Sequence, residues 1–196
     1  MTMMDRQTEL DVVRRLRKGD MVAFDVVYDT FRPRLFAFLL RLTRQRALAE
    51  DLLEETWLRL VSKAEALRTD TRLGAWLFAV ARNLYWSYRR GRLVEESCDA
   101  SLIGFWPVPE DWPSPFDLAA GGELEARVER ALARLPAQHR EVLLLTAYEG
   151  LTPGEAADVC RVSAEVLRQR LKRARDALAE SLELPRGSAS PKRYGT

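Results

Sequence analysis

The chain has 196 residues, of which 47% are hydrophobic and 31% charged, and its 31 basic and 29 acidic residues nearly balance. This composition is typical of a globular protein with one large or two small domains. It argues against a membrane protein, because no run approaches the ~18 apolar residues that a membrane span needs. The N-terminal sequence MTMMDRQTEL lacks the basic and then apolar pattern of a secretory signal, so we expect a cytoplasmic protein without membrane insertion.

No metal centre is expected. The two cysteines, Cys98 and Cys160, lack a metal-ligand spacing, and His139 is the only histidine. Two unrelated thiols fit a reducing compartment. The sequence also lacks a nucleophile–base pair, a metal cluster and a phosphate-binding loop. We therefore expect no cofactor and no enzymatic activity.

Residues 1–92 are expected to form a helical domain. Apolar residues recur at helical spacing over residues 10–18, from 20 to about 42, over 47–66 and over 73–90. Pro33 is expected to break or restart the second of these helices. The third helix offers for the core Leu48, Leu52, Trp57, Leu58 and Val61. The polar stretch 67–72 is expected to be the loop before the fourth helix.

Residues 93–122 interrupt the helical pattern and are expected to form a linker rich in proline and tryptophan. All of its charged residues are acidic: Glu95, Glu96, Asp99, Glu110, Asp111 and Asp117. Basic residues crowd the flanking segments 82–92 and 161–175. This segregation predicts two surfaces that face nucleic acid, separated by a segment that avoids it.

Residues 123–184 are expected to form a second helical domain, followed by a disordered tail over 185–196. Within this domain, residues 151–175 predict two short helices joined by a tight turn. Thr152 occupies the N-cap position of the first helix, and Glu155 follows at the capping-box position. Ser163 occupies the N-cap position of the second. This arrangement is a helix-turn-helix.

The second of these helices has two distinct faces at ~100° per residue. Its apolar side contains Leu167, Leu171, Ala174 and Leu178. Its other side carries Glu165, Arg168, Gln169, Lys172 and Arg173. A helix with one apolar face and one face of charged and hydrogen-bonding side chains suits the major groove of DNA.

The helix predicted over 73–90 combines aromatic and basic residues. Leu77, Val80, Ala81 and Leu84 point one way, and the opposite side carries Arg82, Trp86, Arg89 and Arg90, with Tyr85 and Tyr88 on the flanks. The face is either a solvated surface or a platform on which unpaired bases stack, at ~1–3 kcal/mol per base. Another helix carries Glu50, Asp51, Glu54 and Glu55 on neighbouring faces. Such a face is usually solvated, and a paired-carboxylate enzyme site is less favoured, because no histidine, metal partner or pocket accompanies these carboxylates.

Several segments together resemble one family, the extracytoplasmic-function sigma factors of bacterial RNA polymerase. The resemblance rests on AFDVVYDTFRPRLFAFLLRLT (23–43), AEDLLEETWLRL (49–60), RLGAWLFAVARNLYWSYRR (72–90), LPAQHREVLLLTAYEGLTPGEAADV (135–159) and LRQRLKRAR (167–175). It implies an all-α fold with a sigma-2-like domain over 1–92, the linker over 93–122 and a sigma-4-like helix-turn-helix domain over 123–184. It also implies a protein that binds core RNA polymerase, directs it to specific promoters and is held in check by an anti-sigma factor.

The resemblance assigns roles to three groups of residues. It places at the −10 promoter element Arg68, Thr69, Asp70, Thr71, Arg72, Arg82, Asn83, Tyr85, Trp86, Arg89 and Arg90. It places at the −35 element Ser163, Glu165, Arg168, Gln169, Lys172 and Arg173. It places on the clamp helices of the largest polymerase subunit Asp51, Glu54, Glu55 and Trp57, although Trp57 equally suits the core. The acidic linker is expected to thread the basic channel where nascent RNA runs.

The chain departs from the family pattern at three positions. The family usually has glycine where Arg161 stands in the inter-helix turn, so either Arg161 adopts a left-handed conformation or the turn differs. Threonine is common where this chain has Val166, and glutamine is frequent where it has Glu54. Two alternative functions stay open: a helix-turn-helix regulator that acts without polymerase, and a sigma-like adaptor.

Overall fold

A computed structural model describes residues 4–96 and 122–182. The predicted linker, except for its first and last residues, and the predicted tail therefore lie outside the described residues, as does Cys98. The elements are α1 (Arg6–Leu16), α2 (Met21–Thr43), α3 (Arg46–Lys63), α4 (Leu73–Glu96), α5 (Glu123–Arg134), α6 (Ala137–Leu143), a π-helical turn η1 (Leu144–Tyr148), α7 (Pro153–Cys160) and α8 (Ala164–Ser181). The described residues form no strand, which confirms the all-α prediction.

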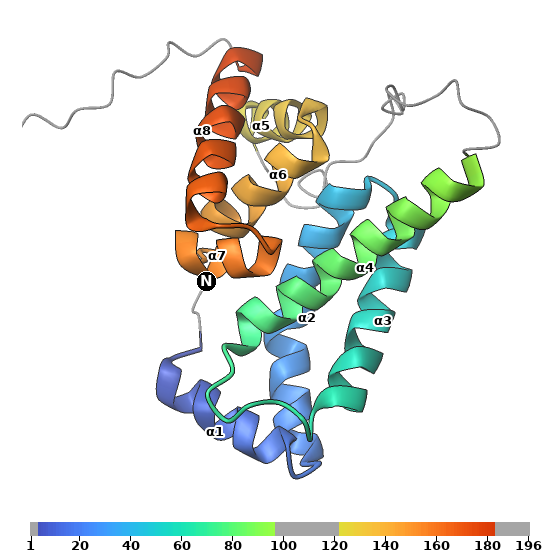
Figure 1. Cartoon of the computed structure of the whole chain (residues 1–196), viewed down its shortest axis with the longest axis vertical. Coiled ribbons are helices and arrows are strands. Elements are labelled where there is room, and N and C mark those ends of the chain that lie inside the picture. Colours follow the sequence, from blue (N-terminus) through green and yellow to red (C-terminus); the bar gives the residue numbers. More distant parts are fainter. Residues whose placement is uncertain (1–3, 97–121, 183–196) are drawn as a thin grey trace, which may run out of the picture.

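Helices α2, α3 and α4 form the body of the N-terminal part, and α1 lies across one end of it (Figure 1). Helices α5 to α8 pack together beside α2 and the first half of α4. None of the helices within residues 4–96 and 122–182 is both long enough and apolar enough to cross a bilayer.

Helix α2 runs without interruption through Pro33, so the predicted break is wrong. Pro33 lies on the solvent side of the helix, where water can bond the carbonyl that the missing N–H leaves free. The opposite side is locked into the core by Phe31, Leu35 and Phe38, each at most 4% exposed. Burial of this stripe offsets the ~3 kcal/mol that an interior proline costs.

Helix α3 packs between α2 and α4, but not all of its predicted core residues are buried. Leu52 and Trp57 are buried, whereas Leu58 and Val61 are 63% and 62% exposed, so their predicted burial is wrong. Trp57 and Val61 are four residues apart and therefore lie on the same side of α3, but neighbouring helices cover only part of that side. Where α4 begins, a Cβ on Gly74 would meet the Phe31 ring at 3.2 Å, so glycine permits the close approach of α4 to α2.

The two parts of the chain share one continuous core. Buried arginines join them at the edges of this core. Arg34 of α2 donates to the Glu149 carboxylate at 2.9 Å and to its backbone carbonyl at 3.1 Å. Arg41 pairs with Glu129 of α5 at 3.0 Å. The C-terminal part therefore packs against α2 through matched, desolvated ion pairs.

Arg140 of α6 bonds the ends of two helices at once. Its guanidinium donates to the carbonyls of Leu132 and Ala133 in the last turn of α5 and of Leu135 just after it, and to those of Arg41 and Leu42 near the end of α2. These carbonyls lie at helix ends, where the regular bond to the residue four positions on is missing; the carbonyl of Leu132 also accepts from the N–H of Leu135 at 3.1 Å. Burial lowers the pKa of Arg140 to about 10. One arginine thus fixes α5 and α2 relative to each other.

Candidate nucleic-acid and polymerase interfaces

Helix α8 exposes the polar face that its sequence predicts. Leu167, Leu171 and Ala174 are buried, at most 7% exposed. The side chains predicted to read DNA all lie on the exposed side: Glu165, Arg168, Gln169, Lys172 and Arg173. Glu165 accepts hydrogen bonds from Arg168 and, at 3.1 Å, from the Gln169 amide, and these bonds lower the pKa of Glu165. The predicted orientation is confirmed, and the polar face is free of the N-terminal part.

The helix-turn-helix that presents α8 is capped at both of its helices. Thr152 and Glu155 form the predicted capping box, with Thr152 N–H donating to Glu155 at 3.0 Å and Glu155 N–H to Thr152 Oγ1 at 3.2 Å. Ser163 accepts from the N–H of Val166 at 3.3 Å, as an N-cap should. Arg161 takes the left-handed conformation, φ 53° and ψ 47°, which the family pattern leaves to glycine.

The predicted stacking face of α4 is covered by the C-terminal part. Glu141 of α6 is 1% exposed, and its two carboxylate oxygens accept from Arg82 Nε at 2.5 Å and from Trp86 Nε1 at 2.7 Å. The prediction that Arg82 and Trp86 point away from the protein is therefore wrong for this conformation. The contact leaves both side chains half-buried, because α6 and α7 pack over them.

Glu141 has a third partner in its own domain. The thiol of Cys160, at the end of α7, donates to Glu141 Oε1 at 2.9 Å. Burial, together with the nearby carboxylate, raises the pKa of Cys160, so the thiol stays protonated and remains a donor. Three donors from α4 and α7 thus surround one buried carboxylate, which compensates for its desolvation.

The remaining α4 residues predicted at the −10 element differ in access. Arg89 and Arg90 are exposed, and Arg89 lies over the Trp86 ring with its guanidinium carbon 5.8 Å from the ring centre. Asn83 is half-buried and accepts from Arg82 at 3.4 Å. Tyr85 is 4% exposed and belongs to the core. Arg89 and Arg90 are therefore the accessible members of the set.

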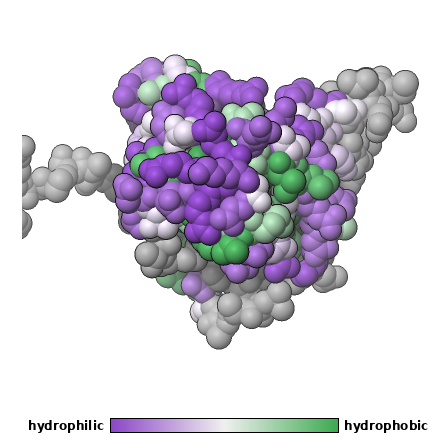
Figure 2. Space-filling model, turned by 90° about the horizontal axis from the view of Figure 1, so that it is seen from below, coloured by the Kyte–Doolittle hydropathy of each residue, from purple (hydrophilic) through white to green (hydrophobic). Residues whose placement is uncertain are grey.

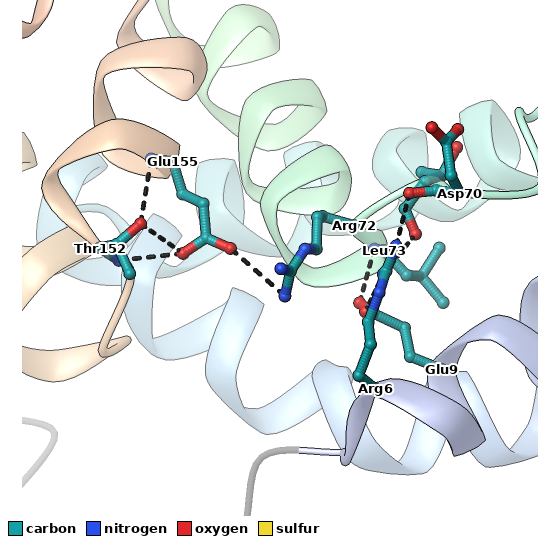
Figure 3. Close-up of polar contacts among 8 residues, drawn as sticks. Arg6, Glu9, Asp70, Arg72, Leu73, Thr152 and Glu155 are labelled. Atoms are coloured by element: carbon teal, nitrogen blue, oxygen red, sulfur yellow. Dashed lines mark hydrogen bonds and ion pairs between the residues drawn. The ribbon is translucent and has the colours of Figure 1, made fainter.

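The loop before α4 turns outward between two buried leucines, Leu67 and Leu73. Arg68, Thr69, Asp70 and Arg72 are exposed, and Thr71 is half-buried. Arg68 and Asp70 form a bidentate pair, 2.9 and 3.0 Å, which lowers the pKa of Asp70. Arg72 lies 3.8 Å from Glu155 of α7, so the C-terminal part also reaches this loop (Figure 3).

The acidic face of α3 is open, but Trp57 is not part of it. Asp51 and Glu54 are exposed, and Glu55 is half-buried in a pair with Arg59 at 2.8 Å. Trp57 is 7% exposed and packs with its ring centre 4.9 Å from that of Tyr28 and 6.1 Å from that of Phe24. Of the predicted polymerase residues, Trp57 is therefore a core residue in this structure.

Comparisons with known proteins agree with this geometry. A family model for sigma-70 region 2 matches residues 27–93, and one for sigma-70 region 4 matches residues 125–178. The ECF RNA polymerase sigma factor EcfG of Rhodopseudomonas palustris is 32% identical over 151 residues, 76% of this chain and 80% of the relative. SigL of Mycobacterium tuberculosis, also an ECF RNA polymerase sigma factor, is 32% identical over 161 residues, 80% of this chain and 87% of the relative.

The chain belongs to the ECF sigma factors. As a member of this family it binds core RNA polymerase and directs it to promoters. Among solved structures, the Bartonella quintana sigma factor RpoE, in complex with the anti-sigma factor NepR, is 27% identical with a TM-score of 0.68. The similarity covers 83% of this chain and 98% of that one.

Sequence reasoning missed the residues through which this ECF sigma factor closes on itself. Glu141, Glu149 and Glu129 are each at most 9% exposed and pair with arginines of the N-terminal part. The sequence contained one signal: each of these glutamates lies at or near a position that the helical periodicity marks as apolar. A charged side chain at such a position is buried and needs a partner. The sequence did not tell which arginine supplies it. Among the described residues no group of side chains forms a metal site, and His139 leaves its Nδ1 unbonded.

Proposed function

We propose that this ECF sigma factor reads the −10 element with α4 and the loop 67–72, and the −35 element with the polar face of α8. The observation that carries this proposal is the presence of two surfaces of different chemistry on one chain. The α8 face offers exposed hydrogen-bonding side chains, which suit base edges in a major groove. The α4 face combines Trp86 with arginines, which suits unpaired bases and phosphates.

Polymerase docking is proposed for the exposed side of α3. Asp51 and Glu54 supply negative charge, and Leu58 adds an exposed apolar side chain one turn further along the helix. Exposed apolar side chains beside charges are typical of protein contacts. Leu58 thus replaces Trp57 in the proposed contact set, because the Trp57 ring is held beneath the surface by Phe24 and Tyr28.

Promoter opening requires that the C-terminal part leave α4. Glu141 occupies the donors of Arg82 and Trp86, and these are the groups proposed to meet DNA. A phosphate or base and Glu141 cannot bind the same donors at once. We infer that binding to polymerase separates the two parts, and that an anti-sigma factor acts by keeping these surfaces from their targets. We propose that the protein works in the cytoplasm, where its polymerase is, and that it catalyses no reaction itself.

Transcription in vitro tests the function directly. Purified core polymerase with the wild-type protein should produce run-off transcripts from a subset of a genomic promoter library. Core polymerase alone is the control. Absence of specific initiation would contradict the proposal.

The docking surface is tested by reversing its charge. Glu54→Lys combined with Leu58→Ala should weaken binding to core polymerase by at least tenfold, because it reverses the charge and removes the apolar contact. Glu180→Lys is the control, since Glu180 is an exposed residue near the end of α8. Wild-type affinity of the double variant in a pull-down titration would refute the assignment to α3.

A further inference from the structure

Helix α1 contacts the backbone of the loop 67–72 and its flanks at several points (Figure 3). Arg6 donates to the carbonyl of Asp70 at 2.8 Å and to that of Thr71 at 3.3 Å. Glu9 accepts from the N–H of Leu73 at 2.7 Å. At the other end of α1, Arg17 donates to the carbonyl of Glu65 at 3.3 Å. The helix therefore holds both ends of the segment that leads into α4.

Glu9 acts as a cap for α4, supplied from another helix. Leu73 is the first residue of α4, and Arg72 before it has no side-chain oxygen that can accept a hydrogen bond. The carboxylate of Glu9, which is 9% exposed, takes that role in its place. A negative charge at this point also interacts favourably with the positive end of the helix dipole.

Arg6 joins the cap to the loop. It lies 2.6 Å from Glu9 and uses its other N–H bonds on the two loop carbonyls. The bonds from α1 go to backbone atoms alone, so the side chains of Arg68, Thr69 and Asp70 stay exposed. The loop is held from behind while its outer side chains remain available.

The outer surface of α1 does not suggest a different role. The end of the molecule on which α1 lies is mostly hydrophilic, with only small apolar areas (Figure 2). The sigma-70 region 2 model begins at residue 27, so α1 lies outside the part that it matches. Helix α1 instead contacts the loop, the start of α4 and α2.

We propose that Arg6 and Glu9 are positioning residues for base recognition by the loop 67–72. This inference rests on the proposed function, in which the loop takes part in reading the −10 element. By fixing the backbone carbonyls of Asp70 and Thr71, α1 removes conformations that the loop would otherwise lose on binding DNA. A pre-ordered loop discriminates better between bases, because a loop held in one conformation cannot rearrange to accommodate a base that fits poorly.

The first test measures base preference in the holoenzyme. Core polymerase is loaded with wild type, Arg6→Ala or Arg15→Ala, and transcribes a library in which each −10 position is varied. Arg15 is the matched control, since it lies on the same helix and pairs with Asp20 at 2.8 Å. Arg6→Ala should reduce the ratio between best and worst base at one position about fivefold, with unchanged binding to core. Arg15→Ala should keep the ratio.

Two outcomes of this test overturn the inference. One is full base preference in Arg6→Ala. The other is an equal loss of transcription from every library member, which indicates loss of folded protein and not of positioning. Thr69→Ala and Asp70→Ala separate this failure from that of the proposed function. If these loop variants change the preference and Arg6→Ala does not, only the positioning role fails; if neither changes it, the proposed role of the loop fails as well.

The second test reads the cap itself, in the free protein. Hydrogen exchange of the Leu73 amide should be about tenfold faster in Glu9→Ala, because its acceptor is gone. Glu9→Gln keeps an acceptor oxygen and should retain most of the protection. Equal exchange in wild type and Glu9→Ala would refute the cap.

Discussion

The two candidate DNA-reading surfaces of this sigma factor differ in what covers them. On α8, the outward side chains are exposed and interact with one another, as Glu165 does with Arg168 and Gln169. On α4, Arg82 and Trp86 bind the buried carboxylate of Glu141, which comes from the other half of the chain. The proposed −35 surface is thus exposed in the free protein, whereas Arg82 and Trp86 of the proposed −10 surface are already bound.

The difference teaches how a chain can restrict promoter opening by itself. A carboxylate offers the same type of acceptor oxygen as a phosphate, so Glu141 satisfies Arg82 in the way that DNA would. The outward side chains of α8 have no such cover and are exposed. Four substitutions test this comparison, in order of decreasing effect.

Removal of a buried arginine should loosen the closed arrangement most. Arg34→Ala leaves Glu149 buried and unpaired, and burial already raises the pKa of that carboxyl. We expect a loss of about 3–5 kcal/mol in the free energy of unfolding. Urea denaturation followed by circular dichroism measures it. Arg59→Ala, which removes an exposed pair with Glu55, is the control and should cost at most about 0.5 kcal/mol.

Neutralising Glu141 should open the α4 face. Glu141→Gln keeps the shape but brings an amide N–H toward two donors, so Arg82 and Trp86 are held less tightly. The affinity of the free protein for a single-stranded −10 oligonucleotide should rise about tenfold, equivalent to ~1.4 kcal/mol. Fluorescence anisotropy measures it, with Glu123→Gln on the exposed start of α5 as control. Unchanged affinity would show that Glu141 does not restrain this surface.

The α8 surface should behave independently of Glu141. Arg173→Ala should weaken binding to a −35 duplex several-fold and reduce the salt slope by about 1, if the side chain contacts a phosphate. The same loss is expected in wild type and in Glu141→Gln, because Arg173 is already exposed. Titrations at three salt concentrations test both points. Coupling between the two substitutions would contradict the open state of α8.

Alkaline pH should lower the stability of the fold slightly through Tyr148. Burial, with nearby Glu129, raises the pKa of Tyr148 to about 12, and its hydroxyl donates to Glu129 at 3.3 Å. A raised pKa means that this contribution to stability is complete below pH ~10 and is lost as the pH rises through ~12. Because the residue is partly exposed, the change should be about 1 kcal/mol. Tyr148→Phe should lack this decline in a series of urea denaturations, and a decline equal to that of wild type would exclude Tyr148 as its source.

Local patterns predicted much of the fold. The helix-turn-helix came from Thr152, Glu155 and Ser163, whose capping roles are all confirmed. Capping depends on residues two or three positions apart, so the sequence contains both partners. The break at Pro33 was predicted wrongly for a related reason. A proline penalty is local, whereas the burial of Phe31 and Leu35 that outweighs it is not.

Some features of the candidate sites were predicted correctly and others were not, again because some depend on nearby residues and others on packing. The prediction that the polar side chains of α8 face outward is confirmed, because the helical periodicity of α8 alone determines it. Trp57 and Leu58 lie next to each other on α3, and their opposite burial depends on Phe24 and Tyr28 of α2. The contacts of the site residues with DNA and polymerase stay predictions.

The sequence by itself determined that the chain is helical, the caps of the helix-turn-helix, the two faces of α8 and the family. These follow from residues within a few positions of one another and from motifs in order along the chain. Only the tertiary structure decided that Glu141 closes on Arg82, 59 positions away, and that Arg6 holds a loop 64 and 65 positions away. No periodicity relates such residues. Their pairing depends on which helices pack together, and the need of a buried charge for a partner then selects the nearest donor.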